Sequence, residues 1–434
     1  MTKLDRQILT LALPSIVSNI TVPLLGLCDV TIMGHVGGAR HIGAIAVGSM
    51  VFNVIYWLFG FLRMTTSGLT AQAYGARRQD QSVAHLVHSL LTGTGIGLVF
   101  IILQLPLLHL SLWLMQATAD IRPMVTTYYY ICIWGAPAVL GLYALTGWYI
   151  GMQNTRIPMC IAIGQNIVNI GVSLLLVIGW KKGIEGVALG TVIAQWTGFL
   201  VALLLLGVFY GKTVRHHLKT VHHAAGSASR QLRLHLDIFL RTFCLVAVNL
   251  YFTSAGSAQG AEILAANTLL MQFFTFFSYV MDGFAFAGEA MAGRYYGARN
   301  KEMLQTCISR LLRWGLAVML LFTLVYGAGG ASLLHLLTTD DSVVATACRY
   351  LPWAVLIPLA GMAAFIYDGI FIGITATRSM LLSCLVAAIV FFVTYLSLKA
   401  LWGNDALWLA LLLYLLLRGI VLHLRIRQCT TFRH

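Results

Sequence analysis

Twelve stretches of this chain contain no aspartate, glutamate, lysine or arginine, and each can form the centre of one membrane-crossing helix. A helix needs about 20 predominantly apolar residues to cross the hydrocarbon core of a bilayer. Since some stretches are shorter than this, we expect several helices to extend past a charge, the second to about Gln72 and the eighth through Asp282 and Glu289. The stretches are residues 7–28, 41–62, 81–119, 123–155, 157–180, 186–211, 242–261, 263–281, 314–339, 350–367, 379–398 and 406–417.

The composition supports this interpretation. Hydrophobic residues make up 59% of the chain and charged residues 10%, whereas soluble domains have about 45–50% and about 25%. Within lipid only helices and closed barrels satisfy every backbone polar group. Barrel strands alternate in polarity, but these runs are continuously apolar. The sequence therefore predicts an all-α integral membrane protein with 12 transmembrane helices.

The basic residues predict the orientation of these helices. Lysine and arginine concentrate in cytoplasmic loops of membrane proteins. If the N-terminus is inside, the outer loops hold five basic residues, namely Arg40, Arg122, Lys181, Lys182 and Lys399, and most others fall in inner loops. We therefore expect both termini to be cytoplasmic. The net charge of +14 then reflects membrane orientation, and no nucleic-acid partner is expected.

The two halves of the sequence resemble each other at a constant offset of 222 residues. The segment Tyr74-Gly75-Ala76-Arg77 recurs as Tyr296-Gly297-Ala298-Arg299, Gly151 recurs as Gly373, and Tyr128 recurs as Tyr350. Six spans per half give both halves the same orientation, so they form a parallel repeat. Secondary transporters are commonly built in this way, with the substrate between the repeats and alternating access to it.

The repeat also predicts the domain organisation. We expect an N-terminal six-helix lobe over residues 1–210 and a C-terminal six-helix lobe over residues 234–434. Between them, residues 211–233 are polar and basic, lack a helical pattern, and are expected to form a cytoplasmic linker.

Four acidic residues lie within or near the ends of the apolar runs: Asp29, Asp282, Glu289 and Asp368. A carboxylate in the bilayer is costly and usually faces a water-filled cavity. Burial disfavours its charged form, so such a group can take up a proton or hold a cation. Pairing with arginine is the alternative, and for Asp282 and Glu289 the candidates are Arg63, Arg241 and Arg294. At the offset of 222 the four acids have no acidic counterpart.

Motifs of other protein classes are absent from the sequence. It has no phosphate-binding loop of an ATPase, no G-x-S-x-G and no H-E-x-x-H. The cysteines are scattered singly and form no metal-ligand pattern. We therefore expect no enzyme activity, no metal site and no cofactor other than a coupling ion.

Several segments resemble the multidrug and toxic compound extrusion (MATE) family. They are Leu11-Ala12-Leu13-Pro14, Gly26-Leu27-Cys28-Asp29-Val30-Thr31-Ile32-Met33-Gly34, Gly68-Leu69-Thr70-Ala71-Gln72-Ala73-Tyr74-Gly75-Ala76, Asp282-Gly283-Phe284-Ala285 and Asp368-Gly369 with Phe371-Ile372-Gly373. The last three indicate the DNA-damage-inducible DinF-like branch. The resemblance covers roughly residues 8–425.

The resemblance implies efflux of amphipathic, often cationic drugs or toxic metabolites in exchange for protons or sodium. It places the coupling site in the N-terminal lobe, where the family residues fall on Asp29, Asn169, Ser173 and Thr191, with Pro14 as a hinge. Relatives carry a second acid where this chain has Ser173. Because a serine does not titrate in this range, we expect altered coupling or a weakened sodium site.

In another branch of the family, acids of the C-terminal lobe bind the cation. Asp368 lies on the tenth helix as one of those acids does, but residues 238–261 of the seventh helix contain no acid. A sodium site of that type is therefore less favoured here.

Two alternatives stay open. A lipid-linked oligosaccharide flippase of the same superfamily would favour fourteen spans and a cationic cavity, whereas this chain has few basic residues within helices. A polytopic membrane transferase would need an acid-rich motif, and Asp340-Asp341 is an isolated doublet. We expect a monomer in a bacterial inner membrane. The substrate and the coupled cation are not determined by the sequence.

Overall fold

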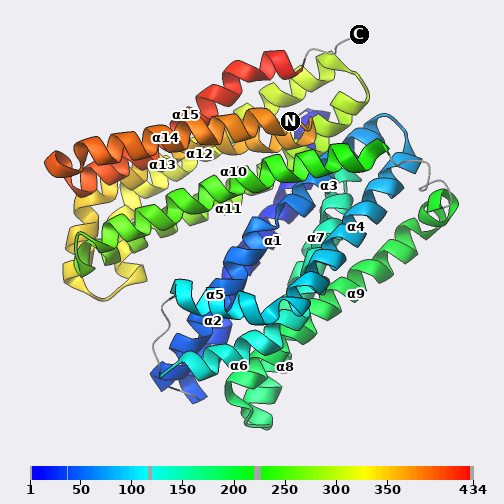
Figure 1. The fold of residues 1–434 in the computed structure, drawn as a ribbon. Coiled ribbons are helices and arrows are strands. Elements are labelled where there is room, and N and C mark those ends of the chain that lie inside the picture. The colour runs from blue at the N-terminus through cyan, green and yellow to red at the C-terminus, as the bar shows by residue number, and fades with distance from the viewer. Residues whose placement is uncertain (1, 37, 116–119, 219–225, 431–434) are drawn as a thin grey trace. The chain divides into compact units, whose positions relative to one another are not determined.

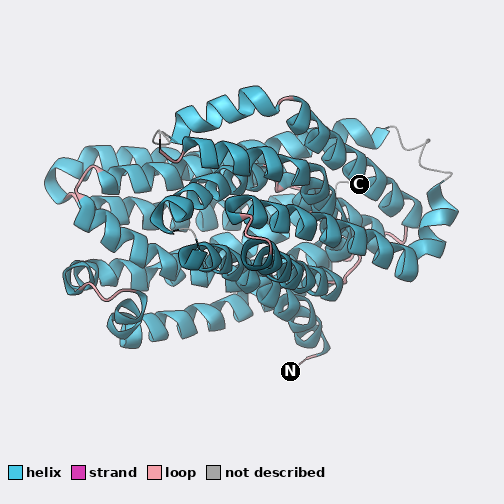
Figure 2. Ribbon diagram, turned by 90° about the horizontal axis from the view of Figure 1, so that it is seen from below, coloured by secondary structure: helices cyan, strands magenta, loops and turns pink. Residues whose placement is uncertain are grey.

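The computed structural model describes residues 2–36, 38–115, 120–218 and 226–430, and every regular element in these ranges is helical (Figure 2). Within them, the side chains of residues 22–27, 29–30, 33–40, 114 and 226–230 lie outside the description. Eleven helical segments of the described residues are long and apolar enough to cross a membrane. Helix α1 (Lys3–Val36), with 34 residues, covers the first predicted span. The all-α membrane fold is confirmed.

The chain divides into two compact units (Figure 1). The N-terminal unit comprises Val17–Leu232. After α1 it contains α2 (Gly38–Leu58), α3 (Phe61–Gly75), α4 (Gln79–Ile102), α5 (Gln104–Met115), α6 (Arg122–Cys132), a 3₁₀ turn (Ile133–Gly135), α7 (Ala136–Gly151), α8 (Arg156–Leu174), a π-helical turn (Leu175–Gly179) and α9 (Gly183–Leu218).

The C-terminal unit comprises Arg233–His434 together with Met1–Ile16. Its helices are α10 (Gly226–Ser257), α11 (Ala261–Gly297), α12 (Lys301–Leu337), α13 (Asp341–Gly373), α14 (Thr377–Trp402) and α15 (Asn404–Cys429). As expected, α11 runs through Asp282 and Glu289.

Two boundaries differ from the sequence-based expectation. Residues 2–16 pack with the C-terminal unit. Asp5 accepts a 3.3 Å hydrogen bond from the indole N–H of Trp314 and forms an ion pair with Arg310 at 3.5 Å. The segment 211–233 was predicted to lack helix, but its described parts are helical: α9 continues to Leu218 and α10 begins at Gly226. Basic side chains in the last turn of α9 interact favourably with the helix dipole, so a basic segment is compatible with helix.

The repeat is visible in the backbone. Three pairs of residues with positive φ are separated by 222 positions: Arg77 and Arg299, Gln153 and Thr375, and Lys181 and Gly403. Equivalent glycines also lie at equivalent helix crossings. A Cβ at Gly147 would lie 2.3 Å from the carbonyl oxygen of Arg63, and one at Gly369 would lie 2.1 Å from that of Ala285. The same backbone plan is thus built twice.

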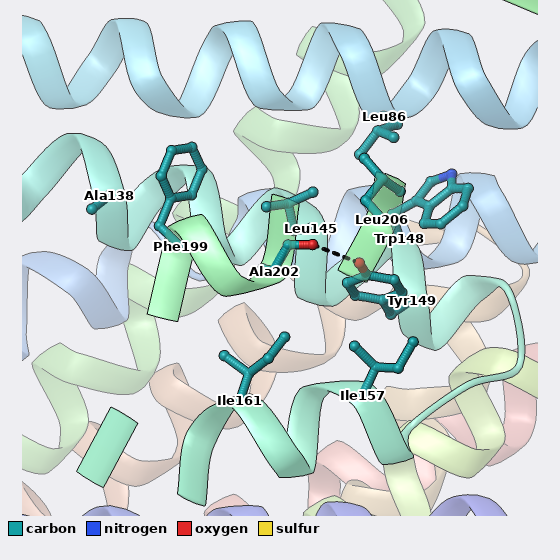
Figure 3. Packing of buried hydrophobic residues seen from close by; sticks show 10 residues of the cluster. All are labelled: Leu86, Ala138, Leu145, Trp148, Tyr149, Ile157, Ile161, Phe199, Ala202 and Leu206. Atoms are coloured by element: carbon teal, nitrogen blue, oxygen red, sulfur yellow. Dashed lines mark hydrogen bonds between the residues drawn. The ribbon is translucent and has the colours of Figure 1, made fainter. Parts of the chain in front are cut away.

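The core of the N-terminal unit between α4, α7, α8 and α9 contains large aromatic side chains, among them Trp148 and Tyr149 (Figure 3). The Tyr149 hydroxyl donates a 2.8 Å hydrogen bond to the carbonyl oxygen of Ala202. The indole N–H of Trp148 is directed to Ser82. Because buried polar groups are costly without partners, these bonds permit large aromatic side chains in the core and fix α7 against α4 and α9.

Candidate functional site

Three of the predicted coupling residues form a polar cluster between α8 and α9, in which Asn169 and Ser173 are buried and Thr191 is half-buried. Asn169 and Ser173 lie one helical turn apart on α8, and both are at most 1% exposed. The amide nitrogen of Asn169 donates a 3.2 Å hydrogen bond to the Thr191 hydroxyl, which donates to the carbonyl oxygen of Val187. The sequence-based grouping of Asn169, Ser173 and Thr191 therefore corresponds to one place in the N-terminal unit.

This cluster contains oxygen atoms that have no hydrogen-bond donor among the described residues. They are Asn169 Oδ1 and Ser173 Oγ. Gln195 Oε1, further along α9, also has no donor among the described residues, but it lies against Gly135 of the 3₁₀ turn. Gln195 was not identified from the sequence, since a glutamine within an apolar run has no distinguishing spacing. Neutral oxygens without donors can accept a hydrogen bond from water or coordinate a cation.

The backbone around Ser173 is unusual. Helix α9 approaches it so closely that a Cβ at Gly190 would lie 2.2 Å from Ser173 Oγ. The π-helical turn Leu175–Gly179 begins two residues after Ser173, and such turns occur frequently at functional sites. Position 190 therefore has to be a glycine for α9 to pack this closely against Ser173.

Helix α1 carries the remaining two residues of the predicted N-terminal site. The side chain of Asp29 lies outside the described part of the chain. Pro14 lies within α1, two residues before the division between the two units. In the N-terminal unit, the side-chain amide of Asn166 on α8 donates a 3.0 Å hydrogen bond to the carbonyl oxygen of Thr21. This bond fixes α1 next to the helix that carries Asn169 and Ser173.

The predicted acids of the C-terminal unit do not form one site. Asp368 on α13 is buried and is bound by both Arg241 of α10 and Arg418 of α15. Arg241 was a candidate partner for Asp282 or Glu289, and the structure places it on Asp368 instead. On α11, Glu289 is fully buried and Asp282 is half-buried.

Arg418 is the group that sequence reasoning did not assign to a site. It directly follows the last charge-free run, 406–417, and its burial within α15 distinguishes it from a loop residue. The cluster of Arg241, Asp368 and Arg418 carries two positive charges and one negative charge. Among the described residues, no group of three or more histidine, cysteine, aspartate or glutamate side chains is arranged to hold a metal ion.

Comparison with known proteins agrees with this architecture. The MatE family model matches residues 14–175 and 238–396. DNA damage-inducible protein F of Escherichia coli is 38% identical over 424 residues, which cover 97% of this chain and 92% of that protein. A probable multidrug resistance protein NorM of Acinetobacter baylyi is 24% identical over 437 residues, 97% of this chain and 95% of that protein.

Solved transporter structures show the same fold. An outward-facing multidrug resistance MATE transporter superposes with a TM-score of 0.82 at 20% identity, covering 99% of this chain and 97% of that chain. The family model and the Escherichia coli relative show the relationship from sequence as well. This chain therefore belongs to the multidrug and toxic compound extrusion (MatE) family, in its DinF-like branch, and is a multi-pass membrane protein.

Proposed function

We propose that this protein exports amphipathic or cationic small molecules across a bacterial inner membrane in exchange for protons, with coupling at Asp29 and the Asn169–Ser173–Thr191 cluster. Its relatives include multidrug resistance proteins. The observation that carries the proposal is the buried polar cluster between α8 and α9, whose Asn169 and Ser173 oxygens have no donor among the described residues. Burying such oxygen atoms without a donor costs free energy. A bound water that donates hydrogen bonds, or a bound cation, would offset that cost.

Protons are favoured over sodium because of Ser173. A sodium site would need several oxygen ligands, and this chain has a hydroxyl where DinF-like relatives carry a carboxylate. Close packing of Gly190 against Ser173 also leaves no room for a ligating side chain at position 190. In this proposal a single carboxylate, that of Asp29, takes up and releases the coupled proton. We expect the transporter to act as a monomer with both termini in the cytoplasm.

The proposal is tested with purified protein in liposomes that contain a pH-sensitive dye. Ethidium is added under an imposed proton gradient, with sodium replaced by potassium in a parallel series. Asp29→Asn is compared with Asp80→Asn, which removes an exposed acid at the start of α4 in the same unit. We expect ethidium to drive proton movement in the wild type and in Asp80→Asn, without sodium, and not in Asp29→Asn.

Other results contradict defined parts of the proposal. A strict sodium requirement would replace the proton by sodium as the coupled ion. Normal exchange by Asp29→Asn would exclude this coupling site, and Asp282 and Glu289 would then be the next candidates for the coupling residue. No exchange of ethidium by the wild type, with folding verified by thermal unfolding, would argue against export of cationic drugs.

A further inference from the structure

Two arginines from different helices converge on one carboxylate oxygen in the C-terminal unit. Arg241 of α10 and Arg418 of α15 each donate through Nη2 to Oδ2 of Asp368 on α13. The side chains of the two arginines are 6% and 5% exposed, and that of Asp368 is 9% exposed. The cluster is buried, and its net charge is one positive unit.

Several polar atoms of this cluster have no hydrogen-bond partner among the described residues. They are the Nε atoms of Arg241 and Arg418, Oδ1 of Asp368 and the hydroxyl of Tyr414. Tyr414 lies one turn before Arg418 on α15, and its ring centroid is 5.5 Å from the Arg418 guanidinium carbon. The donors outnumber the acceptors in this cluster, and Asp368, which contacts both arginines through Oδ2 alone, leaves some of those donors unsatisfied.

A purely structural ion pair would not need the second arginine. One arginine and Asp368 would already be neutral, and a second buried cation adds a desolvation penalty that a shared oxygen offsets poorly. The N-terminal unit is built on the same backbone plan without this cluster. Its residues at the offset of 222 are Asn19, Thr146 and Trp196, none of which is charged. The cluster is therefore a specific feature of the C-terminal unit.

We propose that Arg241 and Arg418 form a carboxylate clamp for the substrate, and that Asp368 occupies this clamp in the present conformation. The inference rests on the proposed export function and specifies its substrate class: amphipathic compounds that carry a carboxylate, including zwitterions. Guanidinium groups bind carboxylates through two parallel hydrogen bonds, and the unused Nε–H groups together with the Tyr414 hydroxyl supply the donors. The substrate carboxylate takes the place of the Asp368 carboxylate, so the charge of the occupied clamp is conserved.

The test compares two substrates that differ only in the carboxylate. One is a rhodamine dye with a free carboxylate and the other is its methyl ester, and export of each is measured in proteoliposomes. The variants are Arg241→Gln and Arg418→Gln, and the control is Arg427→Gln, an exposed arginine on the same helix as Arg418. Each clamp variant leaves a neutral arginine–aspartate pair, so it is expected to fold, which thermal unfolding in detergent verifies.

We expect wild type and Arg427→Gln to export the acid more efficiently than the ester. Each clamp variant should lower the apparent affinity for the acid by about tenfold, the effect of losing one charge-assisted contact, and change that for the ester less than about twofold. Equal effects on both dyes, or export of the ester alone, would overturn the clamp and leave the export function standing. If the wild type exports neither the two dyes nor ethidium, the proposed function itself fails.

Discussion

The N-terminal unit interrupts its helices at positions where the C-terminal unit continues them. Helices α2 and α3 are separated at Phe59–Gly60, whereas α11 runs unbroken through Asp282, the position equivalent to Gly60. Helices α6 and α7 are joined by the 3₁₀ turn Ile133–Gly135, whereas α13 is continuous despite Pro352 and Pro358. The end of α8 changes to a π-helical turn, whereas α14 continues to Trp402.

The two units also differ in the polar groups that they bury. The described cluster between α8 and α9 is neutral, and its unpaired atoms are the oxygens of Asn169 and Ser173. The cluster of α10, α13 and α15 is charged, and its unpaired atoms are mainly donors. The repeat therefore keeps the helix crossings in both units, whereas the buried polar groups differ between them: acceptors in the N-terminal unit and mainly donors in the C-terminal unit.

The largest expected effect is at Asp368. Asp368→Asn leaves two buried guanidinium groups without a counter-charge, which costs roughly 3–5 kcal/mol of the free energy of unfolding. The equivalent change in the N-terminal unit, Thr146→Val, removes one hydroxyl from a half-buried, uncharged site and should cost less than about 1 kcal/mol. Thermal unfolding in detergent, followed by tryptophan fluorescence, measures both. Equal stabilities would show that the arginines do not depend on Asp368.

The sequence predicted the fold because lipid imposes a simple rule on it. A backbone in lipid must be helical or in a closed barrel, so the charge-free runs predicted the spans, and the constant offset predicted the repeat. The grouping of Asn169, Ser173 and Thr191 came from the family resemblance and corresponds to one cluster in the structure. The role of Asp29 in coupling stays a prediction.

The pairing of Asp368 was not predictable from the sequence. Arg241 and Arg418 are distant from it along the chain, by 127 and 50 residues, and which acid each arginine meets depends on how α10, α13 and α15 pack. The end of α9 was likewise misjudged, because polar and basic composition does not by itself exclude helix. Sequence patterns report the environment of a residue better than the identity of its partners.

The helix crossings at Gly147 and Gly369 should be equally tight in the two units. Gly147→Ala and Gly369→Ala each place a methyl group against a backbone carbonyl of the neighbouring helix, and overpacking of this kind costs about 1–3 kcal/mol. Gly95→Ala and Gly329→Ala are matched controls in the two units, since a Cβ there meets no atom within 4 Å. They should be neutral or stabilising by up to about 1 kcal/mol. Destabilisation by only one of the two crossing variants would show that the repeat is not equally packed in the two units.

Helices α4 and α12 begin at equivalent positions of the repeat but differ in their N-caps. Asn300 caps α12 by accepting a 2.9 Å hydrogen bond from the backbone N–H of Met303, whereas its counterpart Arg78 makes no side-chain cap for α4. The backbone angles agree, with φ −92° and ψ 91° at Asn300 and φ −98° and ψ 80° at Arg78. Asn300→Ala should therefore cost about 1 kcal/mol, and Arg78→Asn should stabilise by a similar or smaller amount. If Arg78→Asn has no stabilising effect in thermal unfolding, the matching angles are not sufficient for capping.

The smallest effect is a pH dependence at the start of α13. Asp340 caps this helix, and hydrogen bonds from the Ser342 side chain and from the backbone N–H groups of Val343 and Ser342 hold the pKa of its carboxyl below the usual 3.8. A lowered folded-state pKa contributes stability that is present above pH 3.8 and is lost as pH falls through the lower, folded-state value. The first turn of α13 should therefore lose protection against amide hydrogen exchange, corrected for intrinsic rates, as the pH is lowered below 3.8.

Asp340→Asn keeps an acceptor oxygen and should abolish this dependence. Helix α6 provides the internal comparison, because its N-cap residue Ile121 has no side-chain cap; an equal acid-induced loss of protection there would assign the effect to a general loosening of the protein instead of to Asp340.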